Sequence, residues 1–388
     1  MSVVAADGPA VALVQPHPDQ APDLAPATRP RLFHASMPGY APTALRPAPA
    51  SARALGVAEV LVKDESARLG LPSFKVLGAS WAVYRALLSR LGLSREQVPT
   101  LAALREVVAP LRPLSLAAAT DGNHGRAVAH MAALLGLDAA IYVPANMVGA
   151  RIEAIEGEGA TVTVVPGGYD DAIARSARDA SDRCLVISDT SWEGYEEVPA
   201  WVIEGYTTVF EEIAEQLQGR PAPEVVAVPI GVGALAAAVV RHYWSAGPAG
   251  ERPRLIGVEP TSAACVLESV AAGEIITLDH PQDSIMAGLN CATPSLIAWP
   301  TVSRGIDAYV AVPDARVPEA MRLLAADGIV AGETGAGGLA GMLALVQEAQ
   351  LQDARQEMGL GAGSRVLLLC TEGATDPEAY ERLTAGAA

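Results

Sequence analysis

The sequence predicts an α/β protein with two lobes, each built on a mainly parallel, twisted sheet flanked by helices. Short apolar segments with the character of strands alternate with helical segments along most of the chain, which is typical of βαβ units and parallel sheets. The length of 388 residues exceeds a single small domain. Apolar residues make up 51% of the chain, which is enough for a large core.

In the first half, an expected strand at residues 59–64 ends in charged residues, and a helix is expected at 79–91. A small-residue strand at 114–120 leads to an apolar helix at 127–135, which Gly136 ends. The alternation continues with strands at 139–143, 160–165 and 184–188 and with helices at 149–158 and 170–181.

The second half opens on a longer expected helix at 201–218. It continues with a strand at 224–229, a helix at 234–245, a strand at 254–258 and a last clear strand at 365–370. Residues 1–29 are rich in Ala, Pro and Asp, and we expect them to form a disordered tail. We expect residues 30–85 and 200–388 to form a large domain and residues 86–199 to form a small α/β domain.

The chain is strongly acidic, because 27 Lys and Arg residues face 44 Asp and Glu residues, giving a net charge of −17. A protein of this charge repels phosphate backbones and anionic membranes, so we expect neither a nucleic-acid nor a membrane partner. The longest apolar run, near 225–240, is interrupted by Pro229 and two glycines and predicts a buried strand entering a helix. The N-terminus has no signal-peptide pattern, so we expect a cytoplasmic location.

The cysteines and histidines do not indicate a metal. Cys184, Cys265, Cys291 and Cys370 have no CxxC spacing, which disfavours a zinc ribbon and a disulfide framework. His124 has no second histidine at a metal-ligand spacing, and HExxH is absent. The absence of GxSxG also disfavours a serine hydrolase.

The segment Ser73-Phe74-Lys75 lies just before an expected helix. A lysine beside a bulky apolar residue at such a turn can be partly desolvated, which lowers the pKa of its amine and makes it nucleophilic, as Schiff-base chemistry requires. Taken alone, an exposed loop lysine is the better interpretation.

Two glycine-containing turns could bind anions. Thr120-Asp121-Gly122-Asn123-His124-Gly125 follows a strand and precedes a helix, which suits a carboxylate better than it suits an ordinary N-cap. Gly231-Val232-Gly233-Ala234-Leu235 also links a strand to a helix and could cradle a phosphate. With Ala236 and Glu259 it equally matches a dinucleotide-binding turn, or a plain packing turn.

Four further segments could contribute to a site, but each could equally be a helix cap or a connecting loop. In Ser188-Asp189-Thr190-Ser191-Trp192-Glu193-Gly194-Tyr195, aromatic neighbours could raise the pKa of a carboxylate to that of a general base, or Asp189 could simply cap a helix. The turns at 331–338, with Glu333, and at 370–376, with Thr371, could be connecting loops. So could the turn at Met286-Ala287-Gly288-Leu289.

Taken in order over about residues 30–385, these segments resemble the pyridoxal-phosphate enzymes of fold type II, the group of tryptophan synthase β and threonine dehydratase. The resemblance implies that Lys75 is the Schiff-base lysine and that residues 122–125 grip the substrate carboxylate and the cofactor 3′-hydroxyl. It implies that residues 231–235 form the phosphate loop, in a less glycine-rich form, and that Thr371 faces the pyridine nitrogen. The phosphate loop thereby becomes preferable to the dinucleotide turn, and residues 30–85 with 200–388 become the cofactor-binding domain.

Within that group the sequence is most similar to the diaminopropionate ammonia-lyase family. The shared segments are Lys63-Asp64-Glu65-Ser66, Leu71–Lys75, Thr120–Arg126, Asp189–Tyr195, Met286–Leu289 and Thr371–Asp376. Dehydratases of this fold mostly carry a small residue where Asp121 stands. The resemblance implies that Asp121 and Asp189 are bases for the two enantiomers of the substrate. It also matches Cys265 and Cys291 to a cysteine pair of some members, although a reducing cytosol disfavours a disulfide between them.

The resemblance therefore implies an α,β-elimination of 2,3-diaminopropionate to pyruvate and two ammonia, by Cα proton abstraction and an aminoacrylate intermediate, in a homodimer. The implied catalytic residues are Lys75, Asp121 and Asp189. The implied cofactor contacts are Lys75, Phe74, Asn123, Gly231, Val232, Gly233, Ala234, Leu235, Glu333 and Thr371. The implied substrate contacts are Thr120, Asp121, Gly122, His124, Tyr195 and Met286.

Three alternatives remain open at this point. One is a serine or threonine dehydratase, or a β-replacement enzyme, of the same fold; the alanines at 236–238, where family members add glycines, leave room for a shifted substrate. Another is an NAD-dependent dehydrogenase built on Gly231, Gly233 and Glu259. The third, a non-catalytic amino-acid-binding relative, is disfavoured because binding alone requires none of Lys75, Asp121 and Asp189.

Overall fold

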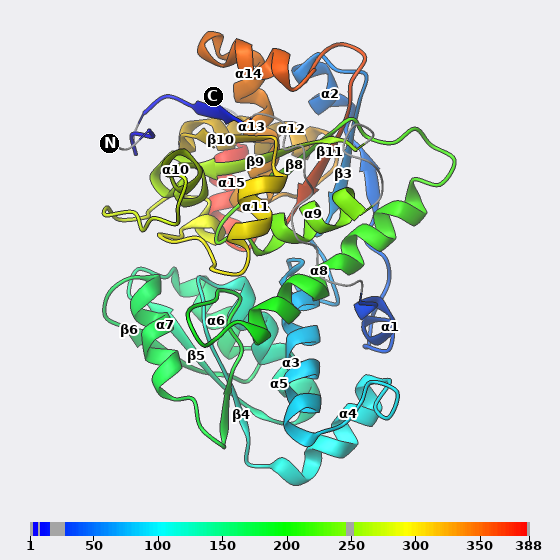
Figure 1. The fold of residues 1–388 in the computed structure, drawn as a ribbon, viewed down its shortest axis with the longest axis vertical. Helices are drawn as coiled ribbons and strands as arrows, with labels where there is room; N and C mark the ends of the chain where they lie inside the picture. The colour runs from blue at the N-terminus through cyan, green and yellow to red at the C-terminus, as the bar shows by residue number, and fades with distance from the viewer. Residues whose placement is uncertain (1–2, 7, 16–27, 246–251, 386–388) are drawn as a thin grey trace. The chain divides into compact units, whose positions relative to one another are not determined.

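The structure is a computed structural model that describes residues 3–6, 8–15, 28–245 and 252–385 (Figure 1). The chain divides into two compact units. The larger unit consists of Met1–Pro26, Thr43–Ala67 and Val209–Ala388, and the smaller unit of Ala27–Pro42 and Arg68–Thr208. Each unit has its own sheet.

The sheet of the larger unit has seven strands in the order β1-β10-β9-β8-β11-β3-β2. The five central strands are parallel, and β1 and β2 pair antiparallel with them at the two edges. The central strands read as continuous apolar runs because both of their faces are buried. The strands are β1 (Val11–Val14), β2 (Leu45–Pro47), β3 (Glu59–Asp64), β8 (Val225–Pro229), β9 (Arg254–Pro260), β10 (Ala308–Val312) and β11 (Arg365–Cys370).

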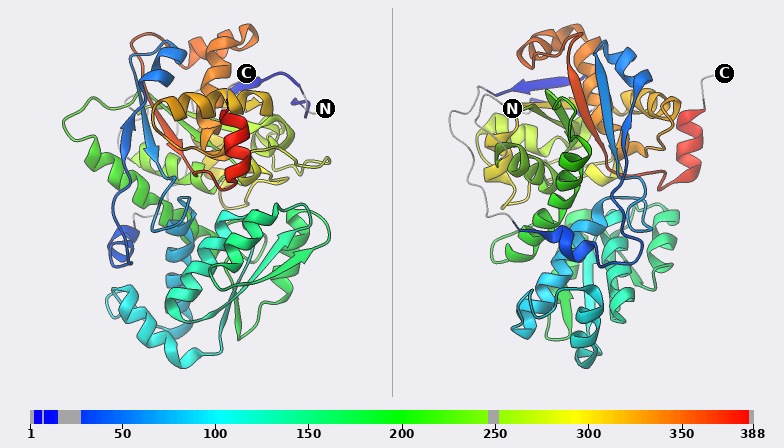
Figure 2. Two further views of the ribbon diagram at one scale, coloured as in Figure 1. Left: turned by 180° about the vertical axis from the view of Figure 1, so that it is seen from behind. Right: turned by 90° about the vertical axis from the view of Figure 1, so that its right-hand side faces the viewer.

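Helices cover both faces of this sheet (Figures 1 and 2). The glycine-rich helix α13 (Glu333–Gln347) packs across β8, β9, β10 and β11, together with α12 (Val317–Ala326) and α2 (Pro49–Leu55). Helix α9 (Ala234–Ser245) lies on the opposite face, where it packs against α11 (Trp299–Gly305) (Figure 2). The remaining helices of the unit are α10 (Cys265–Ala272), α14 (Gln352–Glu357) and α15 (Pro377–Thr384).

The smaller unit has a fully parallel sheet in the order β6-β5-β4-β7. Its strands are β4 (Ser115–Ala119), β5 (Asp138–Pro144), β6 (Thr161–Val165) and β7 (Cys184–Val186). Between them run α5 (Asn123–Leu135), α6 (Gly149–Glu156) and α7 (Tyr169–Arg178), and α3 (Lys75–Leu91) packs on α5. The unit also contains α1 (Pro30–His34) and α4 (Leu101–Val108), while α8 (Glu197–Gln216) starts here and ends in the larger unit.

The predicted fold class is confirmed, and the predicted strands agree with β3 to β9 and β11 within about two residues at each end. Three expectations differ from the structure. The N-terminal tail is not disordered throughout, because β1 pairs with β10; residues 16–27 of the expected tail lie outside the described residues. Helix α3 begins at Lys75 rather than at residue 79, and it belongs to the smaller unit because it packs on α5. That unit comprises Ala27–Pro42 and Arg68–Thr208 rather than residues 86–199. Strands β2 and β10 were not predicted at all.

No helix in the described parts of the chain is long and apolar enough to cross a membrane.

A buried ion pair fixes the end of β3. The Nζ of Lys63 lies 2.7 Å from a carboxylate oxygen of Glu212, and both side chains are fully buried. Lys63 also donates to the backbone oxygen of Thr43 at 2.8 Å. Lys63, one of the charged residues at the end of this strand, is therefore buried inside the larger unit and paired there.

We expect Lys63→Met to lower the free energy of unfolding by about 3 to 5 kcal/mol, because it leaves the Glu212 carboxylate buried without its counter-ion. The double variant Lys63→Met with Glu212→Leu should recover most of that loss. Denaturant unfolding of the two variants checks this, and a loss below about 1 kcal/mol for the single variant would contradict it.

Candidate active site

Lys75 is the first residue of α3, so the helix fixes the direction of its side chain. Its ammonium lies 2.6 Å from Asp189 Oδ2 and 5.6 Å from the centre of the Phe74 ring. That ring in turn packs against the ring of Tyr206, with the centroids 4.6 Å apart. The predicted desolvated lysine is therefore present, and it faces a carboxylate.

The chain has two lysines, Lys63 and Lys75. Lys63 is fully buried in its ion pair, whereas the side chain of Lys75 is 20% exposed. Lys75 is therefore the lysine whose amine can react with a carbonyl compound.

The turn between β4 and α5 is organised by the hydroxyl of Thr120. Its Oγ1 accepts hydrogen bonds from the backbone N–H groups of Gly122 and Gly125, each at 2.9 Å. Gly122 has φ +139°, a conformation that L side chains rarely adopt. Asn123 and His124 then begin α5, with His124 Nε2 2.7 Å from the backbone oxygen of Ile187.

Asp189 lies in the loop after β7, where several groups hold it. Its Oδ1 accepts a hydrogen bond from the Tyr169 hydroxyl at 3.1 Å, and its Oδ2 faces Lys75. The Tyr195 hydroxyl donates to the Val186 backbone oxygen at 2.7 Å and accepts from the N–H of Ser188 at 3.1 Å. Tyr195 thus holds the loop that carries Asp189, and its hydroxyl is already engaged by backbone groups rather than open to a substrate.

The two aspartates have opposite proton affinities. Burial, reinforced by the negative charge of Asp189, raises the pKa of Asp121 to about 8. Burial alone would also raise the pKa of Asp189, but the Lys75 ammonium, together with His124 and Tyr169, holds it well below its usual range. Near neutral pH the pair therefore offers one protonated carboxyl and one carboxylate, a combination suited to acid–base chemistry.

The larger unit supplies a separate group of predicted site residues. The turn from β8 into α9 contains Gly231 and Gly233, and Gly233 needs its glycine because φ is +99°. The backbone N–H groups of residues 231–235 donate to no described residue, although they stand at the start of a helix. Such a row of open N–H groups suits a phosphate.

Thr371 follows β11 at the same edge of this sheet. Its Oγ1 is buried and has no hydrogen-bond partner among the described residues. Glu333 begins α13 beside it: the N–H of Gly332 donates to the backbone oxygen of Glu372 at 3.0 Å. An open hydroxyl in a buried place is costly unless a bound molecule engages it.

Met286 does not support its predicted role as a substrate contact. Its side chain is fully buried in the core of the larger unit and lies against Gly337 of α13. The backbone of its turn nevertheless reaches the site region, because Gly288 N–H donates to Thr334 Oγ1 at 3.2 Å and the Gly288 oxygen lies close to Gly231. The sulfurs of Cys265 and Cys291 also lie against Gly231.

Glu259 rules out the dinucleotide interpretation of Gly231 and Gly233. Its carboxylate is fully buried and accepts hydrogen bonds from the N–H groups of Val266 and Leu267, both at 2.8 Å. It therefore holds the start of α10 and cannot bind a ribose.

Two polar side chains of the smaller unit, Tyr169 and Arg151, lie at the site but outside the motifs that mark it in the sequence. Besides the bond from Tyr169 to Asp189, Arg151 donates to the backbone oxygen of Asp121 at 3.4 Å and lies against Gly122. Both follow the carboxyl ends of neighbouring parallel strands, β6 and β5. The rule that α/β proteins place ligands at that edge of a sheet would have indicated them.

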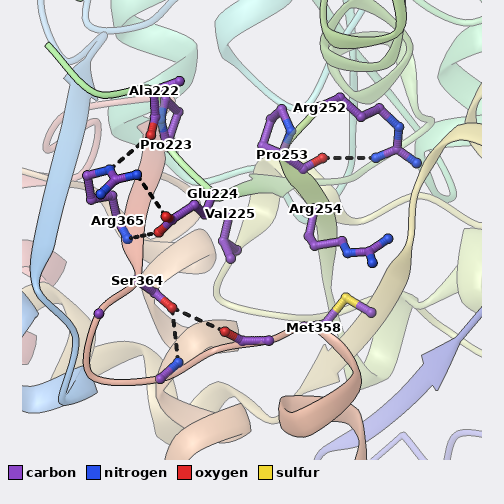
Figure 3. A pocket seen from close by; sticks show the side chains of 13 residues that line it. Ala222, Pro223, Glu224, Val225, Arg252, Pro253, Arg254, Met358, Ser364 and Arg365 are labelled. Atoms are coloured by element: carbon purple, nitrogen blue, oxygen red, sulfur yellow. Dashed lines mark hydrogen bonds and ion pairs between the residues drawn. The ribbon is translucent and has the colours of Figure 1, made fainter. Parts of the chain in front are cut away.

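A cavity of about 700 Å³ lies at the other edge of the larger sheet, where β8, β9 and β11 begin (Figure 3). Its arginines are paired with carboxylates: Arg365 with Glu224 at 2.7 Å and Arg252 with Asp307 at 2.6 Å. None of the predicted site residues lines it. This cavity is therefore not the place of the chemistry.

Comparison with known proteins identifies the family. Residues 37–371 match the family described as pyridoxal-phosphate dependent enzyme. The chain is 35% identical over 362 residues to the diaminopropionate ammonia-lyase of Salmonella typhimurium, covering 90% of this chain and 89% of that protein. The chain belongs to the diaminopropionate ammonia-lyase family. The Escherichia coli K12 member is 33% identical over 360 residues, covering 91% of this chain and 89% of that protein.

Solved structures of the ammonia-lyase from Escherichia coli have the same fold. The complex with D-serine superposes with a TM-score of 0.87 at 31% identity, covering 97% of each chain. The complex with an aminoacrylate–PLP azomethine reaction intermediate gives 0.86 at 30% identity, covering 99% of this chain and 98% of that one.

Pyridoxal phosphate is the cofactor of this ammonia-lyase family member, and the residues of the chain fit it. The open N–H groups at 231–235 suit its phosphate, and the unpartnered hydroxyl of Thr371 suits its ring nitrogen. Lys75 has a partly exposed amine of the kind that such a cofactor requires.

Proposed function

We propose that this chain catalyses the α,β-elimination of 2,3-diaminopropionate to pyruvate and two molecules of ammonia. The observation that carries the proposal is the pair Asp121 and Asp189, one protonated and one ionised, beside Lys75 in the smaller unit. The relatives from Salmonella typhimurium and Escherichia coli carry the name of that activity, which supports the assignment.

In this proposal Lys75 holds the cofactor covalently, residues 231–235 hold its phosphate and Thr371 faces its ring nitrogen. Asn123, Phe74 and Glu333 complete the contacts. When bound, the cofactor supplies an electron sink for the electron pair left on Cα. A neutral hydroxyl at the ring nitrogen favours prompt elimination over transamination. The substrate carboxylate is bound by the turn from Thr120 to His124, at the start of α5.

The two aspartates and Lys75 move the protons. One aspartate, chosen by the configuration of the substrate, removes the proton from Cα. The β-amino group must be protonated to leave. Where it does not already bind as the ammonium, Asp121, whose pKa is about 8, or the Lys75 ammonium can supply that proton. The enamine released from the site hydrolyses in water to pyruvate and the second ammonia.

Pyruvate release from L-2,3-diaminopropionate, D-2,3-diaminopropionate and L-serine, measured in one coupled assay on the holoenzyme, tests the proposal. We expect fast release from at least one diaminopropionate and slow release from serine. Release from serine alone, by a yellow protein, would keep the cofactor and move the function to dehydration or β-replacement.

The rate should also depend on pH through Asp121. Because its raised pKa of about 8 keeps it protonated at neutral pH, it acts as a base only after losing that proton. For the enantiomer whose Cα proton Asp121 removes, kcat/KM should rise about tenfold from pH 7 to pH 9. For the other enantiomer, whose base Asp189 is already ionised at neutral pH, no such rise is expected. Parallel profiles of the two enantiomers would contradict this assignment.

We also propose that the enzyme works in the cytoplasm as a homodimer. The support is the family resemblance, together with the strongly acidic composition, which disfavours nucleic-acid and membrane partners.

A further inference from the structure

His124 has one ring nitrogen with a partner and one without. Its Nε2 lies 2.7 Å from the backbone oxygen of Ile187, and because a carbonyl oxygen can only accept, Nε2 carries the hydrogen. The side chain is 3% exposed, and Nδ1 has no hydrogen-bond partner among the described residues. In the neutral ring Nδ1 is therefore a buried acceptor with no donor. Burial also lowers the pKa of His124, which favours that neutral ring.

This open acceptor faces a carboxylate. Nδ1 lies 3.9 Å from Asp189 Oδ2, too far for a hydrogen bond between them, and neither atom could donate one. The other oxygen of Asp189 is occupied by the Tyr169 hydroxyl. His124 Nδ1 and Asp189 Oδ2 are thus two neighbouring acceptors, one of them charged. Together they form a binding site for a positively charged group that carries more than one N–H.

The chain itself shows which group fits. The Lys75 ammonium lies 2.6 Å from Asp189 Oδ2, so an alkylammonium already occupies the carboxylate side of this binding site. Once Lys75 holds the cofactor, its amine no longer fills that place. Another primary ammonium on a short carbon chain can then replace it, and 2,3-diaminopropionate carries one on Cβ.

We propose that His124 Nδ1 and Asp189 Oδ2 form a subsite for the β-ammonium group of the substrate and thereby select diamino acids over hydroxy amino acids. This inference rests on the proposed function. A serine hydroxyl is neutral and has a single hydrogen, so it leaves either the carboxylate or Nδ1 without a donor. Asp121 does not form an equivalent binding site, because its raised pKa leaves it largely uncharged at neutral pH. The subsite serves the enantiomer whose Cα proton goes to Asp121, which leaves Asp189 free to hold the ammonium.

The test measures binding without turnover. α-Methyl-2,3-diaminopropionate and α-methylserine have no Cα proton, so the holoenzyme binds them without eliminating. Titration calorimetry gives the dissociation constant of each enantiomer of both compounds. The ratio that matters is the dissociation constant of α-methylserine divided by that of α-methyl-2,3-diaminopropionate in the same enantiomeric series. We expect the diamino compound to bind at least about tenfold more tightly than α-methylserine in one enantiomeric series. Equal affinities in both series would overturn the proposal without any variant being made.

Two variants isolate His124. In His124→Gln the amide places a donor and an acceptor one carbon apart, as the ring does with Nε2 and Nδ1, so the ratio should stay within about threefold of the wild type. His124→Met has a similar shape without either polar atom, and the ratio should fall about tenfold. His130→Met is the matched control, because His130 lies on the same helix and pairs with Glu158 instead; it should leave the ratio unchanged.

A purely structural role of His124 would weaken both compounds equally in His124→Met, and that result overturns the proposal. The pyruvate assay separates this failure from that of the proposed function. If the wild type releases pyruvate rapidly from diaminopropionate but the ratios do not change, only the subsite is wrong. If it releases none, the function itself is wrong.

Discussion

Lys75→Ala is expected to abolish pyruvate release and the visible absorbance of the holoenzyme. The reason is that the chain has no other lysine able to replace it: Lys63 is fully buried and paired with Glu212. Losing a covalent catalytic group should lower kcat by a factor on the order of 10³ or more. An unchanged spectrum and rate would show that the cofactor is held elsewhere.

Borohydride reduction of the wild-type holoenzyme gives an independent check, because it fixes the cofactor to the amine that holds it. Peptide mapping should place the label on the peptide that contains Lys75. Only Lys63 and the N-terminal amine compete as primary amines, so a label on either would contradict the assignment.

Substitution of the two aspartates should separate the enantiomers of the substrate. We expect Asp121→Asn and Asp189→Asn each to lower kcat/KM by about 10² to 10⁴ for the enantiomer whose base it removes. Asp121→Asn should affect the other enantiomer much less. Asp189→Asn should also lower kcat/KM of the other enantiomer by about tenfold, because it removes the charge that holds the β-ammonium group. Asp170→Asn is the control, since Asp170 is an exposed neighbour that affects Asp121 only through its charge. It should leave both enantiomers nearly unchanged, with any small change confined to the enantiomer that uses Asp121.

The two-base assignment is wrong if both variants lose the D and L activities in equal proportion. Asp189→Asn also breaks the ion pair with Lys75, so the visible spectrum of each variant should be compared with that of the wild type before the rates are interpreted.

The sequence was sufficient for the elements whose local pattern is strong. The strand at 59–64 and the helix at 234–245 were predicted with the bounds that the structure shows. Strand β10 is as short and as fully buried as β8, but no glycine-containing turn follows it in the sequence to mark its end, and it was missed. Strand β1 was missed for another reason: its pairing partner lies about 300 residues further along the chain, and no local pattern reports such a contact.

The site residues also divide into those that the sequence predicts and those that only the structure shows. Lys75, Asp121 and Asp189 stand in short motifs that the sequence displays, and the structure brings them together. The roles of Tyr169 and Tyr195 depend on where their hydroxyls point. Tyr195 looked like a substrate contact, but its hydroxyl is bound by its own loop, whereas Tyr169 was overlooked and bonds Asp189.

The two edge strands of the larger sheet have a consequence for synthesis of the chain. β1 and β2 are formed by residues 11–14 and 45–47, and they are the two outermost strands of a sheet that is otherwise parallel. The parallel strand next to β1 is β10, which is formed much later in the chain, by residues 308–312. An uncapped edge presents unpaired N–H and C=O groups that can pair with another molecule. Since the ribosome makes the N-terminus first, the strand that covers β10 already exists when β10 emerges. The order of the segments along the chain thus shortens the time during which a nascent molecule could join a neighbour edge to edge.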